Sequence, residues 1–288
     1  MVAPNDPELI RQQYADDAGL RIRQHIHDTY TVPQVNYPEW VLSSVQWRGD
    51  ERVLDVGCGA GTYYAALSEQ QRDVQYYGMD ISPGMLLNHP AAHKSCVGDA
   101  QFLPFGDYMF DVVMAHHMLF YVQDIDSTIR EFRRVMKPGG VLMAATNSAN
   151  NMAELQVLMR RAVLLLARSG MSQINPPAPA SVLFGLENGA RRLARHFFAV
   201  ARHDLPSKLV FSEIDPLIQY LESTRSLREP QLPEDVSWED VMLIMNQQIT
   251  HLITHMGELT ISKLSGVLVA SDNGGFVQDF VRIGDNSG

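Results

Sequence analysis

Short apolar runs alternate with helix-like segments over residues 51–148. The runs lie at 52–56, 74–79, 95–97, 110–115 and 141–145, and each has the length of a β-strand. Helical spacing of apolar positions fills the intervals between them, for example at 126–136. Because strands and helices that alternate in this way form parallel sheets covered on both faces, the pattern predicts an α/β fold.

The flanking regions have a different pattern. Residues 1–50 predict a helical segment, since apolar positions recur loosely until Pro33 and Pro38 interrupt them. After residue 148, helical spacing returns at 151–169, 186–198 and 238–256, and an apolar run at 266–270 predicts a closing strand. We therefore expect four parts, namely an N-terminal helical segment (1–50), a ligand-binding core (51–148), a helical insertion or lid (149–200) and a C-terminal part that completes the sheet (201–288).

The composition indicates which kinds of partner and which cellular compartment to expect. The chain of 288 residues has 23 basic and 33 acidic side chains and a formal net charge of −10. Nucleic-acid binding usually leaves a basic footprint, so this balance disfavours a nucleic-acid partner. The cysteines Cys58 and Cys96 form no disulfide framework or CxxC pattern. The polar N-terminus does not resemble a secretory signal, and no apolar run is long enough to span a bilayer, so we expect a cytoplasmic protein with no membrane partner.

The strongest motif is the segment VLDVGCGAGT at 53–62, where a buried run leads into alternating glycines. Gly57 and Gly59 would let the backbone turn tightly and approach a ligand closely, although a plain strand–helix turn uses the same residues. Thr62 stands where a dinucleotide fingerprint needs its third glycine, and no phosphate-binding Lys-Ser or Lys-Thr pair follows. Asp55 directly before the loop would repel a pyrophosphate but suits a ligand that carries an ammonium and a sulfonium.

Carboxylates also end the next two apolar runs. Asp80 follows the second run, where an acid can accept hydrogen bonds from a ribose diol, and Asp99 follows the third, where an acid can accept from an adenine amino group. Either side chain could instead cap a helix or lie in a solvated loop. Three acids at the ends of three consecutive runs, one of them beside a glycine loop, favour a binding site.

With these motifs the chain resembles the class I S-adenosylmethionine-dependent methyltransferases, in particular the group of small-molecule and ubiquinone-biosynthesis-like enzymes. The resemblance covers residues 50–148 through VLDVGCGAGT (53–62), GMDIS (78–82), GDAQFLPF (98–105), FDVVMAHHMLFYV (110–122) and EFRRVMKPGGVLMAATNS (131–148). It implies a Rossmann-like, seven-stranded, mostly parallel sheet with helices on both faces. The last strand of such a sheet is antiparallel, and residues 267–270 are the candidate for it.

The resemblance also implies a cofactor, S-adenosyl-L-methionine, with S-adenosyl-L-homocysteine as the product, and it assigns roles to residues. Gly57, Gly59 and the loop around them, with Asp55, would contact the methionine part of the cofactor. Asp80, followed by Ile81, would hold the ribose hydroxyls, and Asp99 with Ala100 would bind the adenine. His116 would lie beside the cofactor.

Methyl transfer needs alignment above all, and a general base only where the acceptor carries a proton. His117 and Tyr121 follow the fourth run and are candidates for removing that proton, although both neighbouring histidines could simply pack. A metal site is disfavoured because adjacent histidines on an extended segment point apart and no carboxylate cluster accompanies them. Cys58 and Cys96 are interpreted as packing residues rather than nucleophiles.

The sequence therefore predicts a methyltransferase that acts on a small organic acceptor, with O, N or C as the target atom undecided. One alternative is an RNA or protein methyltransferase that binds its substrate through a basic cluster, formed by Arg191, Arg192, Arg195, His196, Arg202 and His203. Another is a non-catalytic module that binds S-adenosylmethionine. The sequence leaves a monomer and a homodimer open.

Overall fold

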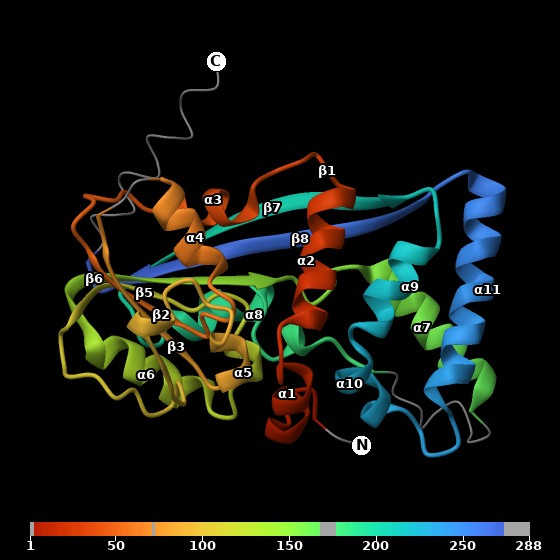
Figure 1. Ribbon diagram of the computed structural model, residues 1–288, viewed down its shortest axis with the longest axis horizontal. Helices are drawn as coiled ribbons and strands as arrows, with labels where there is room; N and C mark the ends of the chain where they lie inside the picture. Colours follow the sequence, from red (N-terminus) through yellow and green to blue (C-terminus); the bar gives the residue numbers. More distant parts are fainter. Residues whose placement is uncertain (1–2, 71–72, 168–176, 274–288) are drawn as a thin grey trace.

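A single eight-stranded sheet runs through the residues that the computed structural model describes, which are 3–70, 73–167 and 177–273. Its strand order is β1-β7-β8-β6-β5-β2-β3-β4 (Figure 1). The strands are β1 (Thr31–Val32), β2 (Arg52–Val56), β3 (Gln75–Asp80), β4 (Ser95–Val97), β5 (Phe110–Met114), β6 (Met136–Asn147), β7 (Ala199–Phe211) and β8 (Leu259–Ser271). Neighbours from β4 to β6 pair in parallel, whereas β8 is antiparallel to β6 and β7.

The sheet confirms the predicted α/β, Rossmann-like fold. The strand predicted at 266–270 lies in the C-terminal half of β8, which is inserted between β6 and β7 as the antiparallel strand. The prediction of seven strands is one short, because the two-residue strand β1 adds to the edge by pairing with β7. Pro33 follows β1 directly and ends it, because proline has no N–H to donate to the neighbouring strand. A strand of two residues is too short to show an alternation of apolar and polar positions in the sequence.

Helices cover both faces of the sheet and gather at one end of it. The α-helices are α1 (Pro7–Gln13), α2 (Ala18–Tyr30), α3 (Tyr37–Leu42), α4 (Thr62–Glu69), α5 (Pro83–Leu86), α6 (Ile125–Val135), α7 (Ala153–Leu166), α8 (Leu186–Leu193), α9 (Asp215–Glu222), α10 (Arg225–Arg228) and α11 (Trp238–Met256). Short 3₁₀ turns are η1 (Ala92–Lys94), η2 (Leu119–Tyr121), η4 (Ala180–Val182) and η5 (Glu229–Gln231).

Each face of the parallel strands has its own apolar layer. On one face, Leu42 of α3 and Leu67 of α4 pack with Val53 of β2. On the other face, Phe132 of α6 and Leu193 of α8 belong to the core around Phe110 and Leu54. These layers explain why β2 and β5 are nearly continuous apolar runs, as strands covered on both sides must be.

A third apolar cluster lies where β7 and β8 extend past the parallel strands. Trp238 and Met245 of α11 pack there with Met159 of α7, Leu217 of α9 and Phe211 of β7. Figure 1 shows α7, α9, α10 and α11 grouped at this end, with α2 standing between them and the rest of the molecule. The C-terminal helices and the N-terminal helix α2 thus lie together at the edge of the parallel sheet.

The ends of the predicted helices are confirmed in one case and wrong in another. The prediction at 238–256 is confirmed by α11, where the Ser237 hydroxyl accepts from the Asp240 N–H at 3.1 Å and Gly257 ends the helix with φ +83°. The helix predicted at 186–198 is too long, because α8 ends at Leu193 and β7 starts at Ala199. Residues 168–169 of the helix predicted at 151–169 lie outside the described residues.

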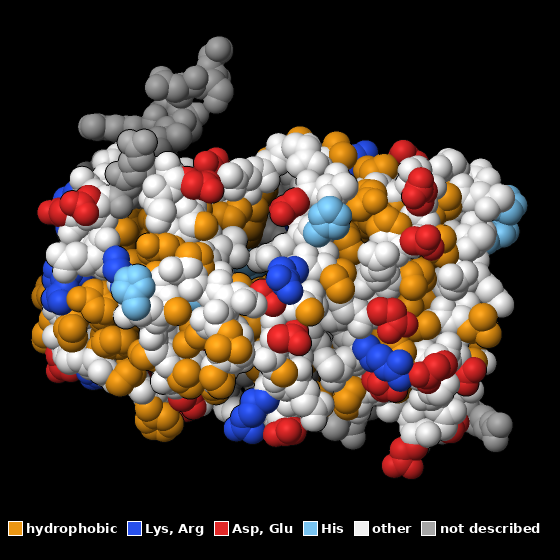
Figure 2. All heavy atoms as spheres, in the orientation of Figure 1, with side chains coloured by type: hydrophobic (Ala, Val, Ile, Leu, Met, Phe, Trp, Pro, Cys, Tyr) orange, Lys and Arg blue, Asp and Glu red, His pale blue; other side chains and the backbone are white. Residues whose placement is uncertain are grey.

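Figure 2 shows acidic and basic side chains interspersed over one face of the molecule, with a hollow near the middle of the view. Among the described helices, none has the length and apolar character needed to cross a membrane.

Candidate functional site

The turn between β2 and α4 is built by three glycines in left-handed conformations. Gly57, Gly59 and Gly61 have φ of +72°, +56° and +86°. At Gly57 an added Cβ would lie 2.8 Å from the Cβ of Met118, so both the backbone conformation and the space require glycine. The N–H groups of Gly57 and Cys58 donate to the carbonyl of Met79 at 2.7 and 3.1 Å, which fixes the turn to the end of β3.

A cavity of about 850 Å³ opens beside this turn. Its volume lies within the range of small-molecule sites. Its wall includes residues from the turn and α4, from the segment after β5, and from the helices at the end of the sheet, among them Gly57, Cys58, Gly59, Thr62, Tyr63, His116, His117, Tyr121, Tyr14, Arg23, Arg228 and Lys263. The cavity therefore joins the predicted cofactor turn to elements far from it in sequence.

Asp80 holds the turn from behind rather than lining the cavity. Its Oδ2 accepts from the Gly59 N–H at 2.9 Å, and its Oδ1 accepts from the Ser82 N–H at 2.8 Å. Burial raises the pKa of the Asp80 carboxyl, and these backbone donors lower it in part. Ile81, the next residue, is 47% exposed at the surface. The roles of Asp80 and Ile81 toward a ribose stay predictions.

Asp55 belongs to a buried polar network. Its Oδ2 accepts from the Tyr76 hydroxyl at 2.9 Å, and that hydroxyl lies 3.1 Å from Nε2 of His89. Nδ1 of His89 accepts from the Ala91 N–H, so Nε2 carries the proton and donates to Tyr76. Burial raises the pKa of Asp55 to about 7. Asp55 is not part of the cavity wall, and its contact with a cofactor ammonium stays a prediction.

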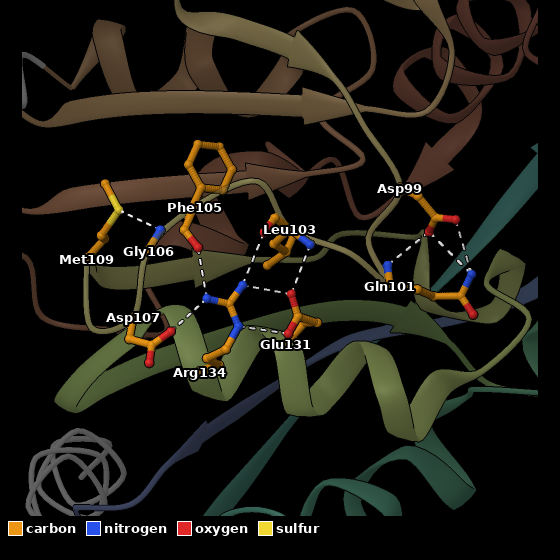
Figure 3. Close-up of polar contacts among 9 residues, drawn as sticks. All are labelled: Asp99, Gln101, Leu103, Phe105, Gly106, Asp107, Met109, Glu131 and Arg134. Atoms are coloured by element: carbon orange, nitrogen blue, oxygen red, sulfur yellow. Dashed lines mark hydrogen bonds and ion pairs between the residues drawn. The ribbon is translucent and has the colours of Figure 1, made fainter.

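Asp99 caps the turn that follows β4. Its Oδ1 accepts from the backbone N–H of Gln101 at 2.9 Å and from the side-chain amide of Gln101 at 3.3 Å (Figure 3). Ala100 beside it is buried. Neither residue lines the cavity, and the capping geometry matches the alternative that the sequence left open. Their contact with adenine stays a prediction.

Arg134 of α6 anchors the chain after Asp99. Its guanidinium donates to the carbonyls of Leu103 and Phe105 at 3.1 and 2.8 Å and pairs with Asp107 and Glu131, both at 2.8 Å (Figure 3). This set of contacts holds the segment 103–107 against α6, although it lacks secondary structure of its own.

His116 lines the cavity and carries a ring N–H donor. Nδ1 of His116 accepts from the Ala145 N–H at 3.2 Å, which puts the ring proton on Nε2. Within the described part of the chain, Nε2 is buried and has no hydrogen-bond partner. The ring lies 3.9 Å from the ring of Tyr63, centroid to centroid. Burial lowers the pKa of His116 well below its usual value, so the ring is neutral.

His117 has a backbone conformation that is uncommon outside glycine, with φ +54°. The conformation is held by the His117 N–H, which donates to the Ala145 carbonyl at 2.8 Å. Nε2 of His117 lies 3.2 Å from the Tyr37 hydroxyl. Burial lowers the pKa of His117 to about 4, so the imidazole is neutral and able to accept a proton. Its catalytic role stays a prediction.

Tyr121 faces the same cavity but in a protonated form. Its hydroxyl accepts from the Tyr14 hydroxyl at 2.9 Å, and the two rings meet edge to face. Burial raises the pKa of Tyr121 well above its usual value. The side chain is therefore suited to donating a hydrogen bond, and its role in removing a proton stays a prediction.

Other chemistries have little support at the cavity. Cys58 lines it, but burial raises the pKa of its thiol, so the nucleophilic thiolate is disfavoured. Across residues 3–70, 73–167 and 177–273 no group of three or more His, Cys, Asp or Glu side chains is arranged to hold a metal ion.

The basic cluster considered for RNA is split between α8, the loop after it and β7. Arg192 and His196 lie 3.9 and 3.2 Å from the carboxylate of Asp126. Arg202 pairs with Asp204 at 2.7 Å and also donates to the carbonyl of Leu186. The ion pairs of Arg192 and Arg202 use part of the charge that a phosphate backbone would need.

Several residues of the cavity wall escaped the sequence analysis. They lie outside the motif segments and come together only in the fold, namely Tyr14, Arg23, Tyr37, Tyr63, Arg228 and Lys263. Tyr63 has a local signal, because it directly follows the glycine motif. The other five residues have no local sequence signal, because they are scattered over helices and strands and form no motif.

The glycine turn, the carboxylate at the end of β3 and the antiparallel strand β8 between β6 and β7 are the features expected from the resemblance to class I S-adenosylmethionine-dependent methyltransferases. Residues 54–144 match the family model of a methyltransferase domain, so this part of the chain is a methyltransferase domain.

Curated proteins are also similar to parts of this chain. The malonyl-[acyl-carrier protein] O-methyltransferase of Serratia marcescens is 32% identical over 132 residues, which cover 45% of this chain and 51% of that protein. The human mitochondrial arginine-hydroxylase NDUFAF5 is 26% identical over 164 residues, covering 56% of this chain and 42% of that protein. The chain thus spans about half the length of the curated relatives it matches.

A solved structure covers more of the chain. The phosphoethanolamine N-methyltransferase 2 of Haemonchus contortus, in complex with phosphomonomethylethanolamine and S-adenosylhomocysteine, has a TM-score of 0.51 and 15% identity. The match covers 95% of this chain and 61% of that chain. At this identity the likeness concerns the fold, and it extends to the helices outside residues 54–144.

Proposed function

We propose that the protein transfers a methyl group from S-adenosylmethionine to a small organic acceptor bound in the 850 Å³ cavity. One observation carries the proposal, which is that a single cavity runs from the glycine turn to a second group of polar side chains. A site that held only the cofactor would not need the second group. His117, Tyr121 and Lys263 line the same cavity outside the glycine turn, so an acceptor would find polar partners that the cofactor does not use.

The residues around the turn would hold the cofactor. Gly57 and Gly59 carry no side chains, so the turn would admit the methionine part closely. His116, whose Nε2–H has no partner among the described residues, would donate to the cofactor or to the acceptor. Asp80 supports the turn by its bond to Gly59 and would serve the ribose, while Asp99 and Ala100 would border the adenine.

The bound cofactor supplies a methyl group on a sulfonium, which is reactive enough that the protein mainly aligns the reacting atoms. His117, held neutral by burial, would accept a proton where the acceptor is a hydroxyl or an ammonium. The half-buried aromatic rings of Tyr63 and Tyr121 line the cavity and would exclude water from the reacting atoms.

The first test is cofactor binding. Titrated S-adenosylhomocysteine should raise the melting temperature of the wild-type protein by mass action. Asp80→Asn should weaken binding by about tenfold or more, the loss expected of a charge-assisted hydrogen bond. Asp50→Asn removes a carboxyl that is 82% exposed and lies outside the cavity wall, so it should leave the binding unchanged.

The second test is turnover. S-Adenosylmethionine with a labelled methyl group should label small molecules in a metabolite extract, and His117→Ala should reduce the transfer without weakening S-adenosylhomocysteine binding in the same proportion. Tight cofactor binding with no labelled product would reject the methyltransferase and favour a non-catalytic binding module. Label found only in RNA or protein would reject the small acceptor.

A further inference from the structure

Two arginines from distant parts of the chain lie in one wall of the cavity. Arg23 comes from α2 and Arg228 from α10, and the tyrosines around them come from three further segments. We call this group the arginine cluster, and it consists of Arg23, Arg228, Tyr14, Tyr121 and Tyr220.

The contacts of the cluster bring its members together. The Arg23 guanidinium carbon lies 5.8 Å from the ring centroid of Tyr14, and the rings of Tyr14 and Tyr121 lie 5.5 Å apart. Arg23 and Arg228 both act electrostatically on the hydroxyls of Tyr121 and Tyr220. Two positive charges therefore lie within electrostatic range of the same tyrosine hydroxyls.

Neither charge is paired with a carboxylate in the part of the chain that the structure describes. Neither Arg23 nor Arg228 takes part in any of the ion pairs found within the described ranges. Nη1 of Arg23 donates to the Ser223 carbonyl at 2.8 Å, whereas its Nη2 is buried without a hydrogen-bond partner among these residues. Burial also raises the pKa of Tyr121 and Tyr220, so no phenolate compensates the arginines.

The rest of the wall does not supply the missing charge. Of the described residues that line the cavity, Asp28 is the one with a carboxylate, and it acts on the ammonium of Lys263. A chain with a net charge of −10 thus has a cavity wall with an excess of positive charge. Because an unpaired charge that is partly withdrawn from water is costly, such a wall is built for an anion.

We propose that Arg23 and Arg228 bind a carboxylate or phosphate group of the methyl acceptor. This inference rests on the proposed function and narrows its acceptor to small organic acids or phosphate esters. A guanidinium fork matches the two oxygens of either anion, and the tyrosine hydroxyls add neutral donors. The cofactor also carries a carboxylate, on its methionine part, but Arg228 acts on Tyr121 and Tyr220 rather than on any residue of the glycine turn.

The test uses protein saturated with S-adenosylhomocysteine, so that the carboxylate of the cofactor is already in place. Malonate and inorganic phosphate are titrated as probes by calorimetry, with dimethyl malonate as the neutral counterpart. Wild-type protein should bind at least one anion and not the diester. Arg23→Gln and Arg228→Gln should each weaken anion binding by about tenfold or more, while the affinity for S-adenosylhomocysteine changes less than about twofold.

Two matched variants control for charge and for folding. Arg21→Gln lies on α2, where Arg21 pairs with Asp17, and Arg225→Gln lies on α10, where Arg225 pairs with Glu229 and Glu239. Neither arginine lines the cavity, so both variants should bind the anions as the wild type does. Melting curves of all four variants show whether a loss of binding reflects a loss of folded protein.

Other results would overturn the assignment. If neither anion binds the saturated protein, or if the two control variants lose binding equally, the cluster is no anion site. If Arg23→Gln and Arg228→Gln weaken S-adenosylhomocysteine instead, the arginines hold the cofactor carboxylate and the acceptor assignment is wrong. A wild type that fails to bind S-adenosylhomocysteine rejects the proposed function itself, and the anion titration, repeated without it, still reports on the cluster.

Discussion

At the scale of single residues, burial decides the protonation of the cavity wall. His117 titrates at a pKa of about 4 in the fold, compared with 6.5 for an exposed histidine. As the pH falls below 6.5, the unfolded chain therefore binds a proton before the folded chain does. The stability that the neutral ring contributes is fully present above pH 6.5 and is lost as the pH falls toward 4.

We expect His117→Gln to flatten this part of the stability profile. Urea unfolding at several pH values from 7.5 to about 4.5 should show wild-type stability falling more steeply than that of the variant, by up to roughly 2–3 kcal/mol in total. The difference between the two proteins should be constant above pH 6.5. Parallel profiles over the whole range would mean that the His117 ring is not desolvated.

The residues of the site differ in how far the sequence could predict them. Gly57 and Gly59 belong to one continuous motif, so their spacing in the sequence was enough to predict the turn. In the structure both glycines lie in the cavity wall. Asp80 ends a recognisable strand, yet its carboxylate is bonded to the turn and is not part of the cavity wall. Arg23 and Arg228 are separated by about two hundred residues of chain, and only the packing of α2 against the C-terminal helices brings them together.

At the scale of elements, the glycine turn between β2 and α4 is specified by sterics. Gly57→Ala would combine a left-handed backbone with a contact of 2.8 Å to Met118. Gly257 after α11 has a similar φ of +83° but nothing within 4 Å of an added Cβ, so Gly257→Ala isolates the backbone effect. We expect Gly257→Ala to lose about 1 kcal/mol, and Gly57→Ala to lose more, as well as the binding of S-adenosylhomocysteine.

Urea unfolding and calorimetric titration of both variants measure these effects. Equal losses of stability would show that Met118 yields to the added methyl group. Wild-type affinity for S-adenosylhomocysteine in Gly57→Ala would remove the turn from the cofactor site.

The elements that the sequence predicted well are those with long periodic patterns. α11 has nineteen residues with an apolar face and a capping serine, and its predicted ends are confirmed. The antiparallel place of β8 came from the family resemblance, because an apolar run does not by itself reveal the direction of a strand. β1 was missed because it exists only through its pairing with β7. The end of α8 was predicted too late because β7 already starts at Ala199.

At the scale of the whole molecule, the cavity joins parts that lie far apart in sequence. Its wall takes Arg23 and Gln24 from α2, Thr62 from α4, Arg228 from α10 and Lys263 from β8. The side-chain amide of Gln24 donates to the Thr62 hydroxyl at 3.1 Å, so α2 touches the start of α4 directly. The predicted lid at 149–200 contributes Met152 and Leu155 to the same wall, and its covering role stays a prediction.

A ligand in such a cavity should therefore order the N-terminal helix as well as the glycine turn. We expect S-adenosylhomocysteine at saturating concentration to slow hydrogen exchange by about tenfold or more in peptides from the β2–α4 turn and from α2, because each local opening would break contacts with the ligand. α11 serves as the internal control, since it packs in the cluster around Trp238 and supplies no residue to the cavity wall. Slower exchange confined to the turn would exclude α2 from the cofactor site. In that case Arg23 would face only the part of the cavity that we assign to the acceptor. Equal slowing in α11 would instead show that the ligand stabilises the whole fold rather than this wall.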